Sequence, residues 1–425
     1  MKVIVIGGGW SGCSAAIIAK KAGATVVLYE KTDLLLGLGN VGGIMRNNGR
    51  YTASEEIIAL GAGDLIHLTD ENSRHKNIDF PGHKHAWLYD VNKIEPVVVN
   101  YLKAMDIEIN MITRVVDVEK EGNTIKGIYL SDGKYVEADV FIETTGSTGP
   151  MGNCLKYGNG CSMCILRCPA YGPRVSISYR AGIEDLKGER QEDVYGAVSG
   201  SCKLAKDSLS DDIVKQLDET GVVILKVPEE DINLDKLKLK VCQQYALKEF
   251  AENIILLDTG HAKLMTSYYA LDKLRKIKGL ENAKYIDPYA GGKGNSIRYL
   301  SVAPRNDSMK VIGLDNLFCA GEKAGLFVGH TEAIITGALA GHNAIRNYLG
   351  MPLLILPRSL AVGDIIAYAN EKMNTKEGRT NRYTFAGAEY FKRMQELGLY
   401  TLEIDKIALK VEKLNLSHIF DEKLI

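Results

Sequence analysis

Four cysteines in one short stretch of the chain are the residues whose type and spacing most clearly indicate chemistry. The remaining cysteines are scattered, whereas this stretch holds Cys154, Cys161, Cys164 and Cys168. In a reducing compartment, where we expect this chain, clustered thiols indicate metal binding or redox chemistry rather than disulfide bridges. The short spacings, with glycines between the first two cysteines, would let the backbone curl so that four thiolates converge on one point.

The spacing of these cysteines favours an iron–sulfur cluster. The last three form C-x2-C-x3-C followed by Pro169, which resembles the end of a bacterial ferredoxin cluster run. With Cys154 as the fourth ligand, we predict a [4Fe–4S] cluster. Structural zinc sites also use four cysteines, but they usually occur as two separated C-x2-C pairs, and only one such pair is present here. Zinc and redox-active thiols without a metal are the two alternatives.

A second pattern with chemical meaning stands at the start of the chain. Residues 7–12, GGGWSG, satisfy G-x-G-x-x-G between an apolar run and a stretch of helical character. In this motif the first glycine allows a tight turn, the second lets a pyrophosphate approach, and the third permits close helix packing. The helix N-terminus offers free N–H groups to the phosphates. We therefore predict a dinucleotide site that includes Gly7, Gly9, Ser11 and Gly12.

An acidic residue follows this loop at the spacing that the motif requires. Glu30 closes the second predicted strand, 24–30, about twenty residues after the glycines, where an acid binds a ribose diol. An acid at this position favours a ribose with free hydroxyls over one with a 2′-phosphate. The alternative is a glycine-rich turn of a parallel sheet that binds no ligand.

Two later segments resemble the FAD-contacting segments of glutathione-reductase-type flavoproteins. They are 138–146 (ADVFIETTG) and 315–322 (DNLFCAGE). The resemblance implies that FAD is the dinucleotide and that Gly146, Gly321 and Glu322 contact it. In that family an acid in the second segment meets the ribityl chain, which points to Glu322.

The resemblance extends to a narrower group. Residues 7–16 (GGGWSGCSAA) are similar to the opening of the glucose-inhibited division protein A family, and 320–344 resemble its C-terminal flavin segment. The same segment, with 277–285 and 351–358, is similar to folate- and FAD-dependent tRNA uridine methyltransferases. This likeness implies FAD binding and suggests a uridine in RNA as substrate. The four-cysteine segment is an addition to the methyltransferase pattern.

The elements that must position these residues follow from the hydrophobic pattern. The opening strand, helix and strand form a βαβ unit. Three strands of a meander are predicted at 112–119, 124–130 and 136–142. A charged and mostly helical stretch is predicted at 203–284, followed by a strand at 315–319 and a long helix at 332–349.

Composition narrows the class of protein. The 425 residues carry 52 Lys+Arg and 53 Asp+Glu, a formal net charge of -1, and 46% of them are hydrophobic. These values exclude a disordered chain, a collagen-like fibre and a strongly basic nucleic-acid coat. No apolar run reaches the ~20 residues of a membrane span, and no export signal precedes the first strand, so we expect a cytoplasmic protein without membrane contact.

The expected fold is α/β: a doubly wound, FAD-binding, glutathione-reductase-like domain with an inserted α+β segment and a helical C-terminal tail. We expect the FAD domain to be discontinuous, with its first part at 1–152 and its second at 285–350. The insert, 153–284, would carry the cluster and substrate, and 351–425 would form the tail.

We therefore predict a FAD-dependent iron–sulfur oxidoreductase whose cluster relays electrons to or from the flavin. Its substrate would be a small molecule or RNA, with an electron-donor protein and a homo-oligomer as further expectations. Cys202, in the run 199–203 (SGSCK), is a candidate reactive thiol. A small-molecule reductase or dehydrogenase with the same centres, and a non-catalytic flavin and zinc protein, are the alternatives.

Overall fold

Short apolar runs build a parallel sheet at the centre of the molecule. The computed structural model describes residues 1–147, 171–188, 201–238, 243–266, 269–286 and 300–425. Apart from the edge strand at 108–110, the strands are almost fully buried, as strands of a parallel sheet covered on both faces must be. In spatial order they are β17 (Leu317–Cys319), β10 (Val140–Glu143), β1 (Lys2–Ile6), β2 (Thr25–Tyr29) and β6 (Glu108–Asn110).

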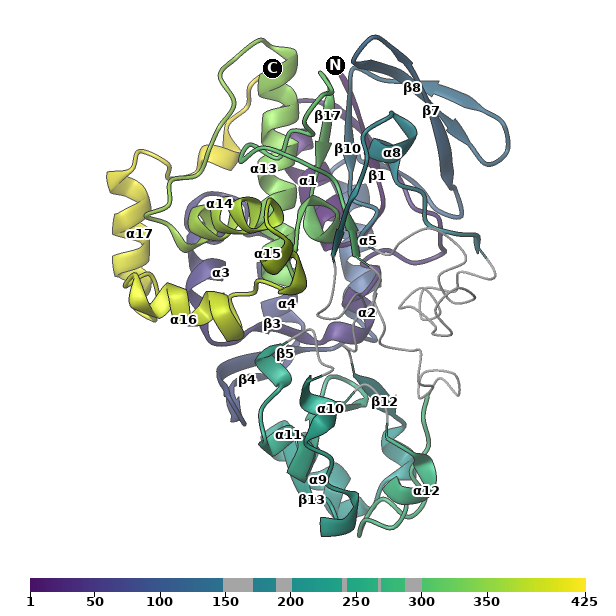
Figure 1. Cartoon of the computed structure of the whole chain (residues 1–425), viewed down its shortest axis with the longest axis vertical. Coiled ribbons are helices and arrows are strands. Elements are labelled where there is room, and N and C mark those ends of the chain that lie inside the picture. The colour runs from purple at the N-terminus through teal and green to yellow at the C-terminus, as the bar shows by residue number, and fades with distance from the viewer. Residues whose placement is uncertain (148–170, 189–200, 239–242, 267–268, 287–299) are drawn as a thin grey trace.

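Two helices cover one face of this sheet and an antiparallel meander lies on the other side (Figure 1). Helix α1 (Trp10–Lys21) joins β1 to β2, and α13 (His330–Tyr348) follows β17 and packs along α1. The meander consists of β7 (Val115–Glu121), β8 (Thr124–Leu130) and β9 (Tyr135–Glu137).

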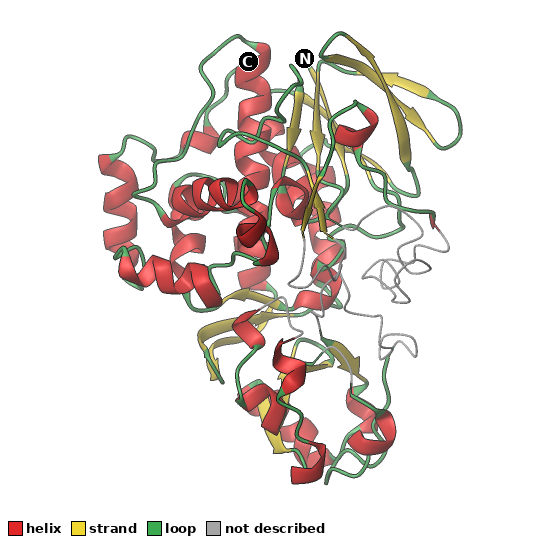
Figure 2. Ribbon diagram, in the orientation of Figure 1, coloured by secondary structure: helices red, strands yellow, loops and turns green. Residues whose placement is uncertain are grey.

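Helices and a small sheet surround this centre. The small sheet has the order β3-β5-β4, with bounds Ile44–Arg46, His83–Tyr89 and Ser73–Phe80. Helices α3 (Gly49–Ala59) and α4 (Asp64–Glu71) lie between β3 and β4 in the chain, α2 (Gly39–Gly42) precedes β3, and α5 (Ile94–Ala104) follows β5. The C-terminal region is helical (Figure 2) and consists of α14 (Ala361–Met373), α15 (Lys376–Thr380), α16 (Ala388–Glu396) and α17 (Ile404–Lys413). Helices α14 and α17 pack on α3.

The insert folds around a sheet of its own, at the bottom of Figure 1. Its order is β12-β15-β14-β13, with bounds Cys202–Leu204, Ala262–Leu264, Asn253–Asp258 and Val222–Lys226, and all pairings are antiparallel. The helices of this part are α9 (Asp211–Thr220), α10 (Asp235–Lys238), α11 (Glu249–Glu252) and α12 (Leu271–Leu274). The expectation of a mostly helical stretch over 203–284 is therefore wrong, because four strands form a sheet there, with β14 buried throughout and β13 only in part, and charged flanking residues conceal them in the sequence.

The predicted meander strand 136–142 is wrong, because the chain leaves the meander after β9 and enters the parallel sheet as β10; other element boundaries differ from the predictions by a few residues. The first meander strand starts at Val115 rather than at 112, because Ile112 turns the chain with a φ of 55°. The long helix starts at His330, two residues before the predicted 332. Two elements within 153–284 pack outside the insert's own sheet: α8 (Ile177–Arg180) contacts β7, and β11 (Leu186–Gly188) pairs with β16 (Leu300–Val302). Over the described part of the chain, no helix has the length and apolar content needed to cross a membrane.

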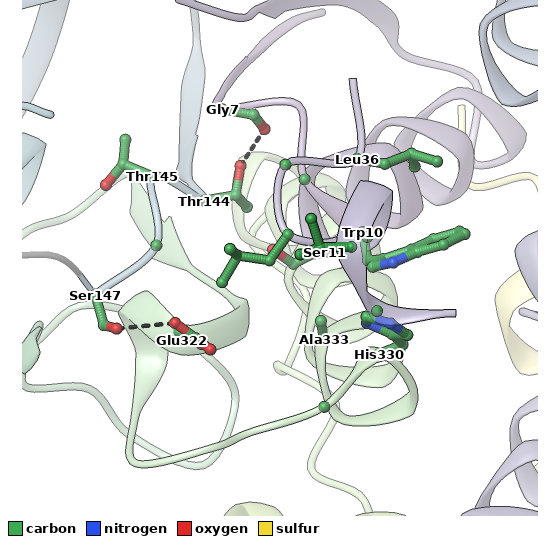
Figure 3. Close-up of a pocket in the computed structure, with 18 of the residues that line it drawn as sticks. Gly7, Trp10, Ser11, Leu36, Thr144, Thr145, Ser147, Glu322, His330 and Ala333 are labelled. Atoms are coloured by element: carbon green, nitrogen blue, oxygen red, sulfur yellow. Dashed lines mark hydrogen bonds between the residues drawn. The ribbon is translucent and has the colours of Figure 1, made fainter. Parts of the chain in front are cut away.

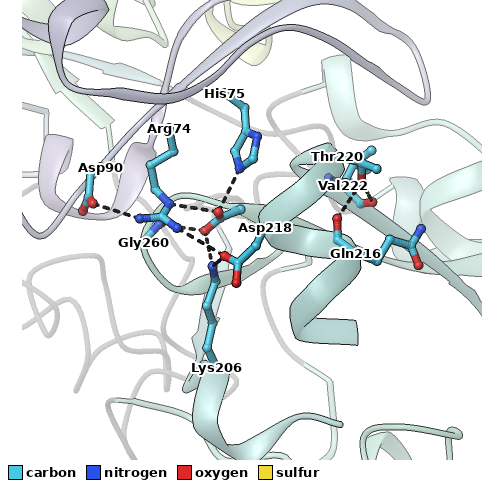
Figure 4. Close-up of polar contacts among 10 residues, drawn as sticks. Arg74, His75, Asp90, Lys206, Gln216, Asp218, Thr220, Val222 and Gly260 are labelled. Carbon is cyan, nitrogen blue, oxygen red and sulfur yellow. Dashed lines mark hydrogen bonds and ion pairs between the residues drawn. The ribbon is translucent and has the colours of Figure 1, made fainter. Parts of the chain in front are cut away.

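A cluster of charged side chains around the buried Asp258 joins the insert to the small sheet (Figure 4). Asp258, at the end of β14, has a fully buried side chain and accepts hydrogen bonds from Arg74 Nε at 2.9 Å and His75 Nε2 at 2.8 Å. Lys206 Nζ lies 2.8 Å from its other oxygen. Burial alone would raise the pKa of Asp258, but the contacts with Lys206, His75 and Arg74 outweigh burial and lower that pKa below its ordinary value.

We expect Asp258→Ala to lower the free energy of unfolding by about 2 kcal/mol, because it leaves three basic groups around an empty position. The depressed pKa adds stability above the ordinary Asp pKa, so the wild type should lose this contribution as pH falls below about 4. Denaturant unfolding across pH measures both effects. Glu403→Ala, which removes an exposed partner of Lys406, is the control and should cost less than about 0.5 kcal/mol. Equal losses in the two variants would contradict the assignment.

Candidate functional site

A cavity of about 280 Å³ opens beyond the carboxyl ends of the parallel strands (Figure 3). Ile6 and Gly7 reach it from β1, Glu30 from β2, and Thr144 from β10. Ligands of open α/β sheets bind at this edge, where the strand order changes direction. The order of this sheet places β1 between β10 and β2, so the cavity lies at that point of change.

The glycine loop forms one wall of the cavity and shows a different constraint at each glycine. Gly7 has a φ of 105° and a Cβ there would lie 2.6 Å from Thr144 O. A Cβ on Gly12 would lie 1.9 Å from Gly7 O, so that position closes the turn against α1. A Cβ on Gly9, by contrast, would meet no atom within 4 Å and would project into open space. Gly9 is therefore the glycine whose missing side chain leaves room for a ligand.

Glu30 is held in one orientation at the end of β2. Its Oε2 accepts the N–H of Gly8 at 2.8 Å, and its Oε1 accepts the N–H and the hydroxyl of Thr32 at 2.9 and 3.0 Å. The side chain is only 9% exposed and lines the cavity. A carboxylate has further lone pairs, so this group can still accept the two hydroxyls of a ribose.

Two helix N-termini face the cavity because α1 and α13 cross at very short range. A Cβ on Gly337 would lie 2.2 Å from Ser11 O, and one on Gly341 would lie 2.5 Å from Ala15 O. The hydroxyl of Ser14 donates to Ile334 O at 2.7 Å across the same interface. Ser11 at the start of α1 and Ala333 in the first turn of α13 both line the cavity. The N–H groups and partial positive charge of both helices are thus available to an anionic ligand.

A buried polar network supports the start of α13. Glu332 is fully buried, and its Oε1 accepts from Thr384 Oγ1 at 2.7 Å and Phe385 N at 2.8 Å, with Arg50 Nε 3.3 Å away. Arg50 lines the cavity and donates to Val328 O at 3.0 Å. The arginine therefore couples the first turn of α13 to the start of α3.

His83 extends this network toward the insert. Its Nε2 lies 3.1 Å from Gln244 O, which requires a proton on that nitrogen, so Nδ1 accepts from Asn47 Nδ2 at 2.8 Å. Burial lowers the pKa of His83 to about 3, so the ring is neutral at physiological pH. Among the described residues, no group of three or more His, Cys, Asp or Glu side chains forms a metal site.

The two segments that resemble flavoprotein sequences meet at the cavity. Ser147 Oγ, just past Gly146, donates to Glu322 Oε2 at 2.9 Å, as Figure 3 shows. Gly321 has a φ of 64° and its N–H donates to Thr336 Oγ1 at 2.9 Å, which fixes the turn that carries Glu322. Arg174 lines the same region and donates to Gly146 O.

The insert supplies the other end of the cavity. Ser201, Gln244, Tyr245, Lys263 and Met265 all line it. Sequence reasoning missed these residues, as it missed Arg50 and Glu332, because they come from distant segments without a local motif. The sequence holds one signal for these cavity-lining residues: Ser201 lies next to Cys202, the candidate reactive thiol, in the run 199–203.

The predicted cysteines fall in two groups. Cys154, Cys161, Cys164 and Cys168 lie outside the described residues. Cys202 lies in β12, is fully buried and packs into the apolar core of the insert with Leu204 and Leu264. Attack by this thiol on a substrate would require β12 to move, and its reactive role stays a prediction.

The comparison with protein families identifies this architecture. The model of the glucose-inhibited division protein A family matches residues 2–249 and 259–352. The chain belongs to this family. Membership supports FAD as the cofactor of the cavity, in agreement with the fit of Gly9, Glu30 and the two helix N-termini.

Curated relatives of the chain are tRNA-modifying enzymes by name. A methylenetetrahydrofolate–tRNA-(uracil-5-)-methyltransferase TrmFO of Dictyoglomus thermophilum is 35% identical over 105 residues, which are 24% of this chain and 23% of the relative. A tRNA uridine 5-carboxymethylaminomethyl modification enzyme MnmG of Alkaliphilus oremlandii is 25% identical over 417 residues, covering 84% of this chain and 63% of the relative. The chain thus spans less than two thirds of the length of these relatives.

A solved structure confirms the predicted fold class. GidA of Aquifex aeolicus, in its form II crystal, has a TM-score of 0.65 and 18% identity, and the match covers 97% of this chain and 76% of that one. The fold is α/β and Rossmann-type, with an inserted α+β segment and a helical C-terminal region. At this identity the match speaks for the fold alone.

We expect two glycines of the loop to have different roles: Gly12 is needed for folding and Gly9 for ligand binding. We expect Gly12→Ala to lower the free energy of unfolding by at least about 2 kcal/mol, because its Cβ overlaps Gly7 O. Gly9→Ala should stay within about 1 kcal/mol of the wild type, because Gly9 has a φ of -69° and open space in front of it. Denaturant unfolding of the ligand-free variants measures both values. A Gly9→Ala variant as unstable as Gly12→Ala would contradict this division.

Proposed function

We propose that this chain is a FAD-dependent oxidoreductase that modifies a uridine of RNA, with a [4Fe–4S] cluster relaying electrons to or from the flavin. The observation that carries the proposal is the cavity at the sheet edge, where an oriented Glu30, an open Gly9 and two helix N-termini come together. Bound FAD would supply two-electron chemistry, and the protein would supply orientation and electrostatics.

The residues around the cavity suit the parts of FAD. Glu30 would accept the adenosine ribose hydroxyls, and the backbone of Gly7, Gly9, Ser11 and Gly12 would face the pyrophosphate. Gly146, Gly321 and Glu322 would contact the ribityl end, since Glu322 is fixed by Ser147 at the cavity wall. Arg50 and the start of α13 would add positive potential to that end.

RNA as substrate is proposed from the relatives, which are named as tRNA uridine-modifying enzymes. A net charge of -1 means that any phosphate contacts must be local. A small-molecule substrate in the same cavity is the competing proposal. Binding of bulk tRNA that weakens steeply as salt rises would favour RNA, and the absence of binding at low salt would favour a small molecule.

The cysteine spacing supports the cluster, and described residues on either side of that segment support its use in electron relay. Ser147 precedes the segment and Arg174 follows it, and both line the cavity. Lys323, fully buried, donates to both Asp185 oxygens at 2.7 Å and so anchors the segment that follows the cysteines. Electron donor, oligomeric state and cytoplasmic location stay predictions.

We also propose a separate role for each part of the chain. Residues 1–152 and 285–350 would bind FAD, 153–284 would carry the cluster and the substrate, and 351–425 would be a helical tail.

The cofactor assignment predicts a binding defect without a folding defect. We expect Gly9→Ala to lose FAD affinity by about a hundredfold or more, because its Cβ fills the space in front of the loop while the fold stays intact. Titration of the deflavinated protein with FAD, followed by quenching of flavin fluorescence, measures the change. Gly350→Ala, at a site where a Cβ also meets no atom, is the control and should leave FAD affinity unchanged. Wild-type affinity in Gly9→Ala would sink the assignment.

The cluster assignment predicts stoichiometric inorganic components. Anaerobically purified protein should hold about four irons and four acid-labile sulfides per chain, with a broad visible absorption that dithionite bleaches. Cys161→Ser should lose iron and keep flavin, whereas Cys242→Ser, outside the four-cysteine group, should keep both. Stoichiometric zinc without sulfide would overturn the cluster and leave the flavin proposal standing.

A further inference from the structure

Two lysines of the insert face each other at the cavity. In the pairing of β12 with β15, Lys203 stands directly opposite Lys263, while Cys202 stands opposite Leu264. Side chains alternate along a strand, so the cysteine and leucine enter the apolar core and the lysines point the other way. Like charges directly opposite on adjacent strands are destabilising. A chain that keeps this pair places positive charge here at a cost in stability.

The two lysines differ in what they reach. Lys203 Nζ donates to Asn40 O at 2.6 Å, and Lys203 does not line the cavity. Lys263 Nζ donates to Val41 O at 2.8 Å and to Ser201 Oγ at 2.6 Å, and both Lys263 and Ser201 line the cavity. Both lysines therefore anchor the insert to the same turn, but only Lys263 is also part of the cavity wall.

The ammonium of Lys263 polarises the hydroxyl of Ser201. Because Ser201 Oγ accepts from Lys263, its own proton must be donated elsewhere, and no residue in the described ranges accepts it. Lys263 is only 5% exposed, so its charge acts in a poorly hydrated environment, where electrostatic interactions are stronger than in water. The Ser201 hydroxyl, polarised by Lys263, can thus donate its proton to an electron-rich oxygen of a bound molecule.

The neighbouring side chains favour a planar ligand. Met265 follows the last residue of β15, two residues after Lys263, and it also lines the cavity. The ring of Tyr245 is held between His83 at 4.9 Å and Phe250 at 5.6 Å, measured between ring centroids, and it lines the cavity as well. A flat ring could lie against these two side chains with one edge toward Ser201.

We infer that Ser201, polarised by Lys263, forms a substrate subsite that binds the ring carbonyl oxygen at position 4 of a planar pyrimidine, or an oxyanion formed from it, with the ring lying against Tyr245 and Met265. This inference rests on the proposed function, because it assigns the substrate end of a cavity whose other end holds FAD. The same donors would stabilise negative charge that develops on that oxygen when the ring is attacked.

The test compares two probes on the FAD-loaded full-length protein. Uridine and cytidine 5′-monophosphates share sugar and phosphate, but uracil presents a carbonyl where cytosine presents an amino group. Each is titrated while the absorbance of the bound flavin is followed. Wild type should bind the uridine nucleotide about tenfold more tightly, because an amino group cannot accept the proton of the Ser201 hydroxyl that Lys263 polarises.

Variants separate binding from anchoring. Lys263→Met should lose about tenfold in affinity for the uridine nucleotide and little for the cytidine nucleotide, and Ser201→Ala should lose part of the preference. Lys203→Met is the matched control, because it removes the other anchor to the same turn and should keep the preference. Lys263→Arg keeps the charge and should retain most of it, which covers the case in which Lys263→Met folds poorly.

Three results would overturn the inference. One is a wild type without preference between the two nucleotides. Another is an equal loss in Lys203→Met and Lys263→Met, which would make both lysines anchors only. The third is a Lys263→Met variant that keeps its preference for the uridine nucleotide but whose flavin absorbance changes in the absence of nucleotide. That result would mean that the oxygen bound by Ser201 and Lys263 belongs to the flavin and not to the substrate. Failure of the wild type to bind FAD would instead refute the proposed function.

Discussion

The close crossing of α1 and α13 is the constraint on which the site depends. At Gly337 and Gly341 no side chain separates the two helices, and the backbone of α1 at Ser11 and Ala15 occupies the space that a Cβ would need. Two helices in such contact can hold a single relative position, so the N-terminus of one fixes that of the other. The glycine loop before α1 and the Gly321 turn before α13 are brought together in this way, although they lie far apart in the sequence.

The insert then closes the cavity from the other side. Its contacts are both apolar and polar: Phe250, Ile255, Leu257 and Met265 share a buried apolar cluster with the small sheet, the Asp258 cluster joins it to Arg74 and His75, and two lysines hold the turn at 40–41. The apolar cluster holds the two parts together, and the directional hydrogen bonds fix their orientation. The consequence is a cavity with a backbone-rich end that suits a phosphate-bearing cofactor and a side-chain-rich end that suits a second molecule.

The sequence predicts those parts of the site that are encoded locally. The glycine loop, Glu30 and the Gly321–Glu322 turn each follow a strand, and a motif of a few residues contains the physical reason for its position. Ser201, Lys263 and Arg50 have no such motif, because what brings them to the cavity is the pairing of β12 with β15 and the packing of α3. Cys202 shows the limit most clearly. Because side chains alternate along an extended chain, Cys202 points into the core while its neighbour Ser201 points to the cavity. If the insert is predicted to be helical, the sequence does not show which of these two residues faces the cavity.

The central claim is that the cavity holds a dinucleotide flavin through its adenosine half. The direct measurement is to purify the wild-type protein anaerobically, release its flavin by heat, and identify and quantify it by chromatography against protein concentration. The account predicts FAD at about one molecule per chain, since Glu30 and the glycine loop bind the part of the cofactor that FMN lacks. Recovery of FMN, or of no flavin in protein that does not take up added FAD, would contradict it.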